Sequence, residues 1–190
     1  MRRTFGVWLA IAAVALCGVI VASVLREGPD SLTLPLSDAS IIRQQAAEKH
    51  LDPALIAAVI YAETKFEPRT SSAGAEGLMQ ILPATAYYLA HLSGGITFTA
   101  SDLGKPAVNL AYGSYYLRYL LDHYEGNEML AVAAYNAGLT NVDGWVAHAR
   151  ERGTQLTVES IPFPETREYV RRVLSAQQDY RTTYPRQLGS

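Results

Sequence analysis

Glu63 is the residue of this chain whose setting most clearly suggests acid–base chemistry. It follows the segment 54–62, which is apolar on every side and is therefore predicted to be a helix in the middle of a domain. A carboxyl group at the end of such a helix loses hydration on folding, and its pKa should rise because desolvation disfavours the charged form. The alternative from the local pattern is that Glu63 simply ends the helix at the surface.

A glutamic acid that stays protonated near neutral pH can donate a proton to a glycosidic oxygen, as glycosidases do with a carboxyl group in an apolar pocket. Ordinary glycoside hydrolysis needs a second carboxylate as base or nucleophile. Glu67 and Glu76 are the candidates nearby, both in the polar, turn-rich segment 65–76, which we interpret as a loop. Neither has an apolar setting, so mechanisms with one carboxylate and with two both stay open.

The composition argues against several other kinds of chemistry. The one cysteine, Cys17, lies in an apolar N-terminal stretch, which excludes a disulfide framework and a cysteine-based metal site. The formal net charge is -2 without a long basic run, so nucleic acid is not an expected partner. Four histidines show no ligand spacing, and we expect neither a metal nor a cofactor. They are His50, His91, His123 and His148.

The N-terminal segment is predicted to be a membrane anchor. An uncharged stretch, 4–25, follows Arg2 and Arg3, and about 20 apolar residues suffice for a spanning helix. Cleavable signals usually have a shorter apolar region, so we favour a retained anchor, although 21–23 resembles a cleavage site. The positive-inside rule places the two arginines in the cytoplasm and the rest of the chain on the extracytoplasmic side of the cell membrane.

The chain beyond this segment is predicted to be all-α, that is, mainly helical. Capping residues and prolines mark helix starts, most clearly at Asp52-Pro53, and no sustained strand alternation occurs except for a short piece near 154–158. We divide the chain into a cytoplasmic tip and anchor (1–26), a tether (27–36), a helical domain (37–184) and a tail (185–190).

Five short motifs stand in a fixed order along the helical domain. Each motif alone is weak, but together they resemble the soluble-type lytic transglycosylase (SLT) domain, which has a lysozyme-like fold akin to that of goose-type lysozymes. The resemblance covers roughly 41–180. The motifs lie at 61–64 (Tyr-Ala-Glu-Thr), 77–81 (Gly-Leu-Met-Gln-Ile), 109–117, 134–138 (Ala-Tyr-Asn-Ala-Gly) and 164–170.

The resemblance implies a peptidoglycan lytic transglycosylase. Glu63 would protonate the bond between N-acetylmuramic acid and N-acetylglucosamine and would then, as a base, help the muramyl 6-hydroxyl attack the anomeric carbon. The product would be a 1,6-anhydro sugar, with no water consumed. The muramyl N-acetyl group would stabilise the cation in place of a second carboxylate.

The resemblance also implies roles for residues around Glu63. Tyr169 would hydrogen-bond to Glu63 and orient it, and Asn136 would contact substrate near the scissile bond. Met79 would pack on a sugar face, Gln80 would help line the subsite, and Tyr135 would support the wall of the cleft.

Thr64 stands where the family usually has serine after its glutamate. Its hydroxyl could still bond to substrate, while its methyl group stiffens the side chain and takes space. Two other functions remain open: a hydrolytic muramidase of the same fold, and a catalytically silent peptidoglycan-binding scaffold. Partner proteins are not identified, since cell-wall or secretion machinery could each use such an enzyme.

Overall fold

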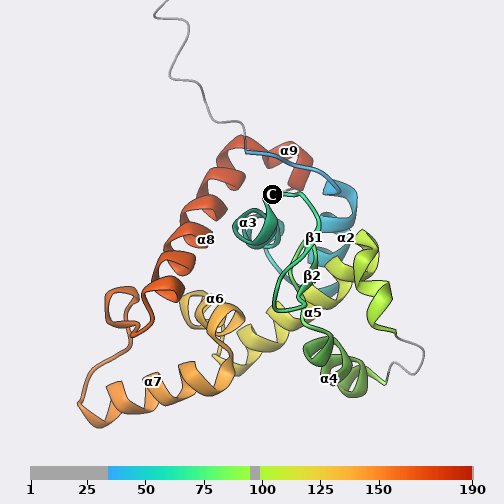
Figure 1. Ribbon diagram of the computed structural model, residues 1–190. Coiled ribbons are helices and arrows are strands. Elements are labelled where there is room, and N and C mark those ends of the chain that lie inside the picture. Colours follow the sequence, from blue (N-terminus) through green and yellow to red (C-terminus); the bar gives the residue numbers. More distant parts are fainter. Residues whose placement is uncertain (1–33, 95–98, 190) are drawn as a thin grey trace, which may run out of the picture. The chain divides into compact units, whose positions relative to one another are not determined.

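Helices dominate the residues that the computed structural model describes, which are 34–94 and 99–189 (Figure 1). The mainly helical architecture expected from the sequence is therefore confirmed for this part of the chain. In chain order the elements are α2 (Ala39–Lys49), α3 (Pro53–Thr64), β1 (Arg69–Thr70), β2 (Glu76–Gly77), α4 (Pro83–Ser93), the 3-10 helix η1 (Ala100–Gly104), α5 (Pro106–His123), α6 (Glu128–Ala137), α7 (Leu139–Glu151), η2 (Val158–Ser160), α8 (Pro164–Thr183) and α9 (Pro185–Leu188).

The predicted membrane anchor, 4–25, lies outside the described residues, as does most of the predicted tether, 27–36. Within the described ranges, none of the helices combines the length and the apolar character that crossing a membrane requires.

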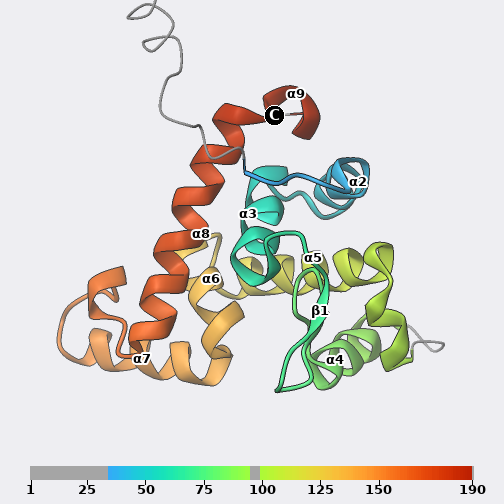
Figure 2. The same cartoon turned by 45° about the horizontal axis from the view of Figure 1, so that its top comes forward.

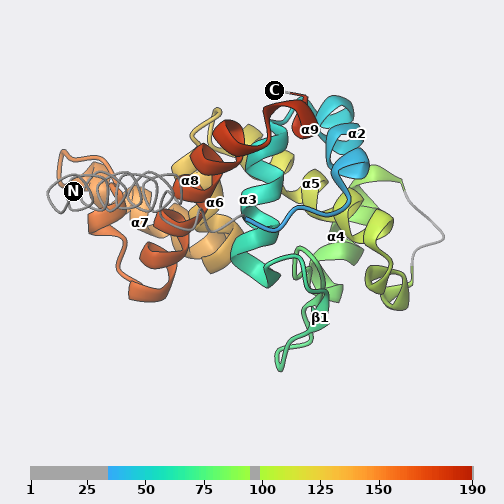
Figure 3. The same cartoon turned by 90° about the horizontal axis from the view of Figure 1, so that it is seen from above.

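Helix α3 occupies the middle of the helical domain. Asp52 caps it by accepting a 2.9 Å hydrogen bond from the backbone N–H of Ala54, and Pro53 takes the first helical position, as the sequence predicts. The following residues, 54–60, are all buried. Figure 3 shows why, since α8 flanks α3 on one side and α2 on the other. An apolar surface all round the helix is what such surroundings require.

Helix α8 packs along α3 and also contacts α6 (Figure 2). Its buried residues recur three or four positions apart, which places them on one face of the helix. Asp52 joins the N-terminal end of α3 to the C-terminal part of α8. Its Oδ2 lies 2.6 Å from a guanidinium nitrogen of Arg181 and accepts a 2.8 Å hydrogen bond from Gln177. The buried face of α8 includes Thr166, Tyr169, Val170, Val173, Ala176 and Tyr180.

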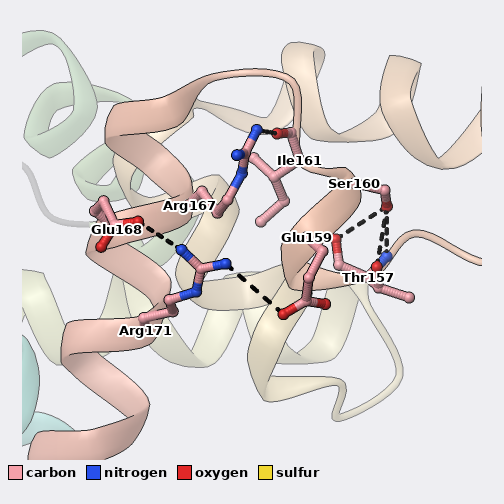
Figure 4. A network of polar contacts seen from close by, with 7 residues as sticks. All are labelled: Thr157, Glu159, Ser160, Ile161, Arg167, Glu168 and Arg171. Atoms are coloured by element: carbon pink, nitrogen blue, oxygen red, sulfur yellow. Dashed lines mark hydrogen bonds and ion pairs between the residues drawn. The ribbon is translucent and has the colours of Figure 1, made fainter.

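A polar network fixes the segment that leads into α8 (Figure 4). Arg167 donates a 2.9 Å hydrogen bond to the carbonyl of Ile161. Arg171 lies 2.5 Å from a carboxylate oxygen of Glu168 and 3.8 Å from one of Glu159. These contacts attach Ile161 and η2 to the first turns of α8.

Three segments differ from the sequence-based expectation. The predicted loop 65–76 contains a short antiparallel pairing, in which Arg69 faces Gly77 and Thr70 faces Glu76. The residues 154–157 form no strand and lead into η2. The predicted tail contains α9, which buries Leu188 and packs on α2. Local sequence could not reveal that packing, because it depends on contacts between the two ends of the domain.

Candidate active site

Glu63 lies in the last turn of α3, and Tyr169 reaches it from α8. The Tyr169 hydroxyl donates a 2.7 Å hydrogen bond to Oε1 of Glu63. Burial raises the pKa of Glu63 to about 7, although the Tyr169 hydrogen bond and the charges of Arg69 and Arg172 act in the opposite direction. Burial has the larger effect, so an acid close to neutral pKa results, as the sequence predicts.

Tyr169 is buried, with only 5% of its surface exposed. Desolvation, followed by the negative charge of Glu63, raises the pKa of its hydroxyl well above the ordinary value. The hydroxyl therefore stays protonated and remains a donor. The close packing of α3 on α8 sets this geometry, and the predicted orienting contact from Tyr169 to Glu63 is present.

Two exposed arginines lie within electrostatic reach of the carboxyl group, and the sequence analysis missed both. Arg69, on β1, donates a 2.6 Å hydrogen bond to the backbone carbonyl of Glu63. Arg172 follows Tyr169 by three positions on α8, and its charge lowers the pKa of both Tyr169 and Glu63. Helical spacing from Tyr169 could have identified Arg172 as a neighbour of the acid, since residues three apart share a helix face.

Asn109 of α5 shapes the segment 76–81, which lies beside the end of α3. Its Oδ1 accepts a 2.8 Å hydrogen bond from the N–H of Met79, and its Nδ2 donates to the carbonyls of Glu76 and Leu103 at 2.8 and 3.0 Å. Gly77 has a φ of +73°, and a Cβ there would lie 2.3 Å from Nδ2 of Asn109. Only glycine fits this close approach with this backbone conformation.

The expectation that Met79 packs on a sugar face is not met. Its side chain has no exposed surface and lies against α5, where a Cβ added to Gly113 would come within 2.3 Å of the Met79 sulfur. The physical reason is that Gly113 has no side chain, so the flexible thioether of Met79 can pack directly against the backbone of α5. Met79 therefore packs in the core beneath the surface of the site and does not line it.

Thr64 also differs from its expected role. Its surface is 3% exposed, and its hydroxyl donates to the carbonyl of Leu78 at 2.8 Å, with the carbonyl of Ile60 at 3.2 Å. A threonine hydroxyl has one proton to donate, and because these backbone carbonyls accept it, none is left to donate to a substrate. In this structure it joins the end of α3 to the segment 76–81.

The remaining predicted residues lie in two parts of the chain, Tyr135 and Asn136 on α6 and Gln80 in the segment after β2. Tyr135, half-buried on α6, donates a 2.9 Å hydrogen bond to the carbonyl of Met79, as a supporting wall residue would. Asn136 is exposed, and its Oδ1 accepts a 2.8 Å hydrogen bond from Thr166. Gln80 donates to the carbonyls of Arg69 and Gly77 at 2.8 and 2.9 Å, so its amide braces the β1–β2 hairpin.

The two candidate second carboxylates have other settings. Glu76 accepts a 2.8 Å hydrogen bond from the Thr70 hydroxyl across the hairpin, and Glu67 is exposed. In the part of the chain that the structure covers, the side chains that shift the pKa of Glu63 are Tyr169, Arg69 and Arg172, and no carboxyl group is among them. The arrangement is that of one half-buried acid with a hydroxyl donor and two nearby cations.

Comparison with known proteins gives consistent matches. The family model described as "Transglycosylase SLT domain" matches residues 40–158. A soluble lytic murein transglycosylase of Escherichia coli K12 is 33% identical over 150 residues, which cover 77% of this chain and 23% of that protein. A putative soluble lytic murein transglycosylase of Haemophilus influenzae is 37% identical over 158 residues, or 81% of this chain and 27% of that protein.

A solved structure extends the likeness to three dimensions. It is that of an inactive mutant of lytic transglycosylase Slt from Pseudomonas aeruginosa, which matches with a TM-score of 0.73 and 30% identity over 92% of this chain and 29% of that one. The chain spans about a quarter of the length of the curated relatives it matches. The described fold is therefore the mainly helical, lysozyme-like transglycosylase fold.

Proposed function

Because the chain belongs to the transglycosylase SLT domain family, we propose that it is a peptidoglycan lytic transglycosylase. The names of its relatives, which include soluble lytic murein transglycosylases, support this substrate and reaction. The observation that carries the proposal is the 2.7 Å hydrogen bond from Tyr169 to Glu63, a carboxyl group whose pKa burial raises to about 7. Such a group can give up a proton and take one back within a single reaction.

In the first step of the proposed reaction, Glu63 acts as general acid. Its Oε1 accepts the hydrogen bond from Tyr169, which leaves Oε2 to carry the proton. That proton passes to the oxygen of the β-1,4 bond between N-acetylmuramic acid and N-acetylglucosamine. The bond between this oxygen and the muramyl anomeric carbon breaks, and the muramyl N-acetyl group stabilises the positive charge that develops on the carbon.

In the second step, the Glu63 carboxylate acts as base. It takes the proton of the muramyl 6-hydroxyl while that oxygen bonds to the anomeric carbon, which gives a 1,6-anhydro sugar and regenerates the acid. Between the two steps Glu63 is charged, and Tyr169, Arg69 and Arg172 all stabilise that form. The site can thus hold the carboxyl group in both protonation states.

The same proposal includes the location of the enzyme. The uncharged stretch 4–25 behind Arg2 and Arg3 supports a single-pass anchor in the cell membrane, with the catalytic domain on the extracytoplasmic side. The anchor would keep the domain close to the peptidoglycan that it cleaves.

Mass spectrometry of the products tests the reaction. The purified full-length chain is incubated with peptidoglycan, and we expect fragments that end in 1,6-anhydro-N-acetylmuramic acid. Fragments heavier by one water would contradict the proposal in favour of hydrolysis. Binding without any cleavage would do so in favour of a scaffold.

Two glutamine variants assign the acid. Glu63→Gln is expected to abolish cleavage while the far-ultraviolet circular dichroism spectrum stays that of the unaltered chain. Glu67→Gln, four positions further on and exposed, is the matched control and should keep full activity. Cleavage by Glu63→Gln at the normal rate would show that Glu63 is not the acid.

A further inference from the structure

Thr166 and Tyr169 lie one turn apart on the buried face of α8, and their hydroxyls donate hydrogen bonds to two different helices. Tyr169 donates to Glu63 at the end of α3, whereas Thr166 donates to Oδ1 of Asn136 on α6 at 2.8 Å. A separation of three positions corresponds to about 4.5 Å along a helix axis. A single turn of α8 therefore contacts both the acid and the amide that is expected to meet the substrate.

The two partners of this hydrogen bond differ in their exposure. Thr166 is 2% exposed, because it lies where α8 packs on α6, whereas Asn136, in the last turn of α6, is exposed. Within the residues that the structure covers, the Thr166 hydroxyl is the hydrogen-bond partner of the Asn136 side chain. An exposed asparagine without such a partner moves among several staggered rotamers. The buried hydroxyl thus fixes the direction of an exposed carboxamide.

The proton of the Thr166 hydroxyl determines which end of the carboxamide faces α8. A buried hydroxyl needs an acceptor for its one proton, and in the described part of the chain that acceptor is Oδ1 of Asn136. The reversed amide would place its NH2 group against the hydroxyl and leave the hydroxyl proton unpaired. Oδ1 therefore faces Thr166. Nδ2, which has two protons to donate, meets no acceptor among the described residues and is left for a ligand.

We propose that Thr166 is a positioning residue, which fixes the Asn136 carboxamide so that its NH2 group donates to an oxygen of the glycan bound at Glu63. The inference rests on the proposed function and extends it from the acid to the amide. The amino sugars of peptidoglycan carry hydroxyl and N-acetyl oxygens, all of which accept hydrogen bonds. Because the same turn of α8 bonds to Glu63 and to Asn136, the acid and the amide are held at a fixed separation.

Three substitutions on α8 test the hydroxyl of Thr166. Thr166→Val keeps the shape of the side chain and removes the donor. For this variant of the full-length chain, kcat/KM on soluble, uncross-linked glycan strands should fall by about 5- to 10-fold, the effect of one neutral hydrogen bond. Thr166→Ser keeps the hydroxyl and should recover most of that loss. Thr182→Val is the matched control, because it removes a hydroxyl that bonds to the backbone carbonyls of Gln178 and Asp179, and it should leave kcat/KM unchanged.

A double-mutant cycle separates positioning from a general effect on the packing of α8. Asn136→Ala removes the amide, so the addition of Thr166→Val to that variant should lower kcat/KM further by no more than about twofold. An equal loss from valine in the presence and in the absence of Asn136 would show that Thr166 acts through packing, and the proposal would be overturned. Full activity of Thr166→Val in the otherwise unaltered chain would overturn it as well.

Nuclear magnetic resonance tests the positioning without any reaction. The three-bond couplings from Cγ of Asn136 to its backbone N and C′ report χ1, and they take extreme values for a single rotamer and intermediate values for an average of rotamers. The unaltered chain and Thr166→Ser should give extreme values, and Thr166→Val intermediate ones. Intermediate values in the unaltered chain, or extreme ones in the valine variant, would overturn the positioning role. If the couplings are as expected but the unaltered chain cleaves no glycan, it is the proposed function that fails.

Discussion

Tyr169 and Glu63 are 106 positions apart in the chain, yet the tyrosine hydroxyl donates a 2.7 Å hydrogen bond to the glutamate across the interface between α8 and α3. Burial favours the neutral acid, whereas this hydrogen bond favours the carboxylate. Burial prevails, and the pKa of Glu63 rises to about 7. The contact thus limits how far burial raises the pKa and keeps both protonation states within reach.

Tyr169→Phe removes the donor while keeping the ring that fills the interface. The pKa of Glu63 should rise further, because the hydrogen bond stabilises the carboxylate more than it stabilises the neutral acid. The high-pH limb of the kcat/KM profile, which reports loss of the acid proton, should then move to higher pH. The maximum rate should fall by about 10- to 100-fold, because the carboxyl group loses its orientation. A pH–rate profile of the variant checks this, and a limb displaced to lower pH would contradict it.

Glu63→Gln is expected to change stability in a pH-dependent way. The pKa of Glu63 is raised from 4.5 to about 7 on folding, so the folded state binds the proton more tightly than the unfolded chain does. The contribution of Glu63 to stability is fully present below the unfolded pKa and is lost as pH rises through about 7. Above that pH, glutamine should raise the free energy of unfolding by about 2–3 kcal/mol relative to glutamate.

Urea denaturation at about pH 4 and about pH 8 measures this difference. The two chains should be nearly equally stable at the lower pH, where the glutamate is mostly protonated in both states. A difference that is the same at both pH values would show that the amide acts through packing and not through the charge.

Arg172→Gln should raise the pKa of Glu63, because the arginine charge favours the carboxylate. The high-pH limb of kcat/KM should move upward at low ionic strength and by less in high salt, since screening weakens the interaction of exposed charges. Arg171→Gln is the matched control. That arginine is paired with Glu168 and Glu159 and has no part in the pKa of Glu63. Equal displacement in both variants would point to a general change in net charge.

The main features of the site could be predicted from local sequence. Asp52-Pro53 marks the start of α3, and the apolar run after it predicts a central helix with an acid at its end. The structure confirms the cap and the burial of 54–60, and the setting of Glu63 at the end of this helix raises its pKa. The cap depends only on neighbours in the sequence, and the apolar run indicates that the helix is buried even though α8 and α2 supply the packing.

The orientation of single side chains could not be predicted in the same way. A motif such as 77–81 gives the residue types but not their neighbours in space. Met79, in a turn, points into the core because Gly113 on α5 leaves room for its sulfur. The same limit hid Arg69, which lies on the paired strand β1 and donates a hydrogen bond to the carbonyl of Glu63.

Thr64 gives the sharpest test of this difference between motif and structure. Thr64→Ser keeps the hydroxyl bond to the carbonyl of Leu78, so stability should change by less than about 1 kcal/mol and kcat/KM should be retained. Thr64→Val keeps the shape and removes the donor. It should cost about 1–3 kcal/mol of unfolding free energy, because a buried carbonyl loses its partner. Denaturation curves and steady-state kinetics of both variants check this. If valine raised KM without changing stability, the hydroxyl would contact the substrate and not the backbone of 78.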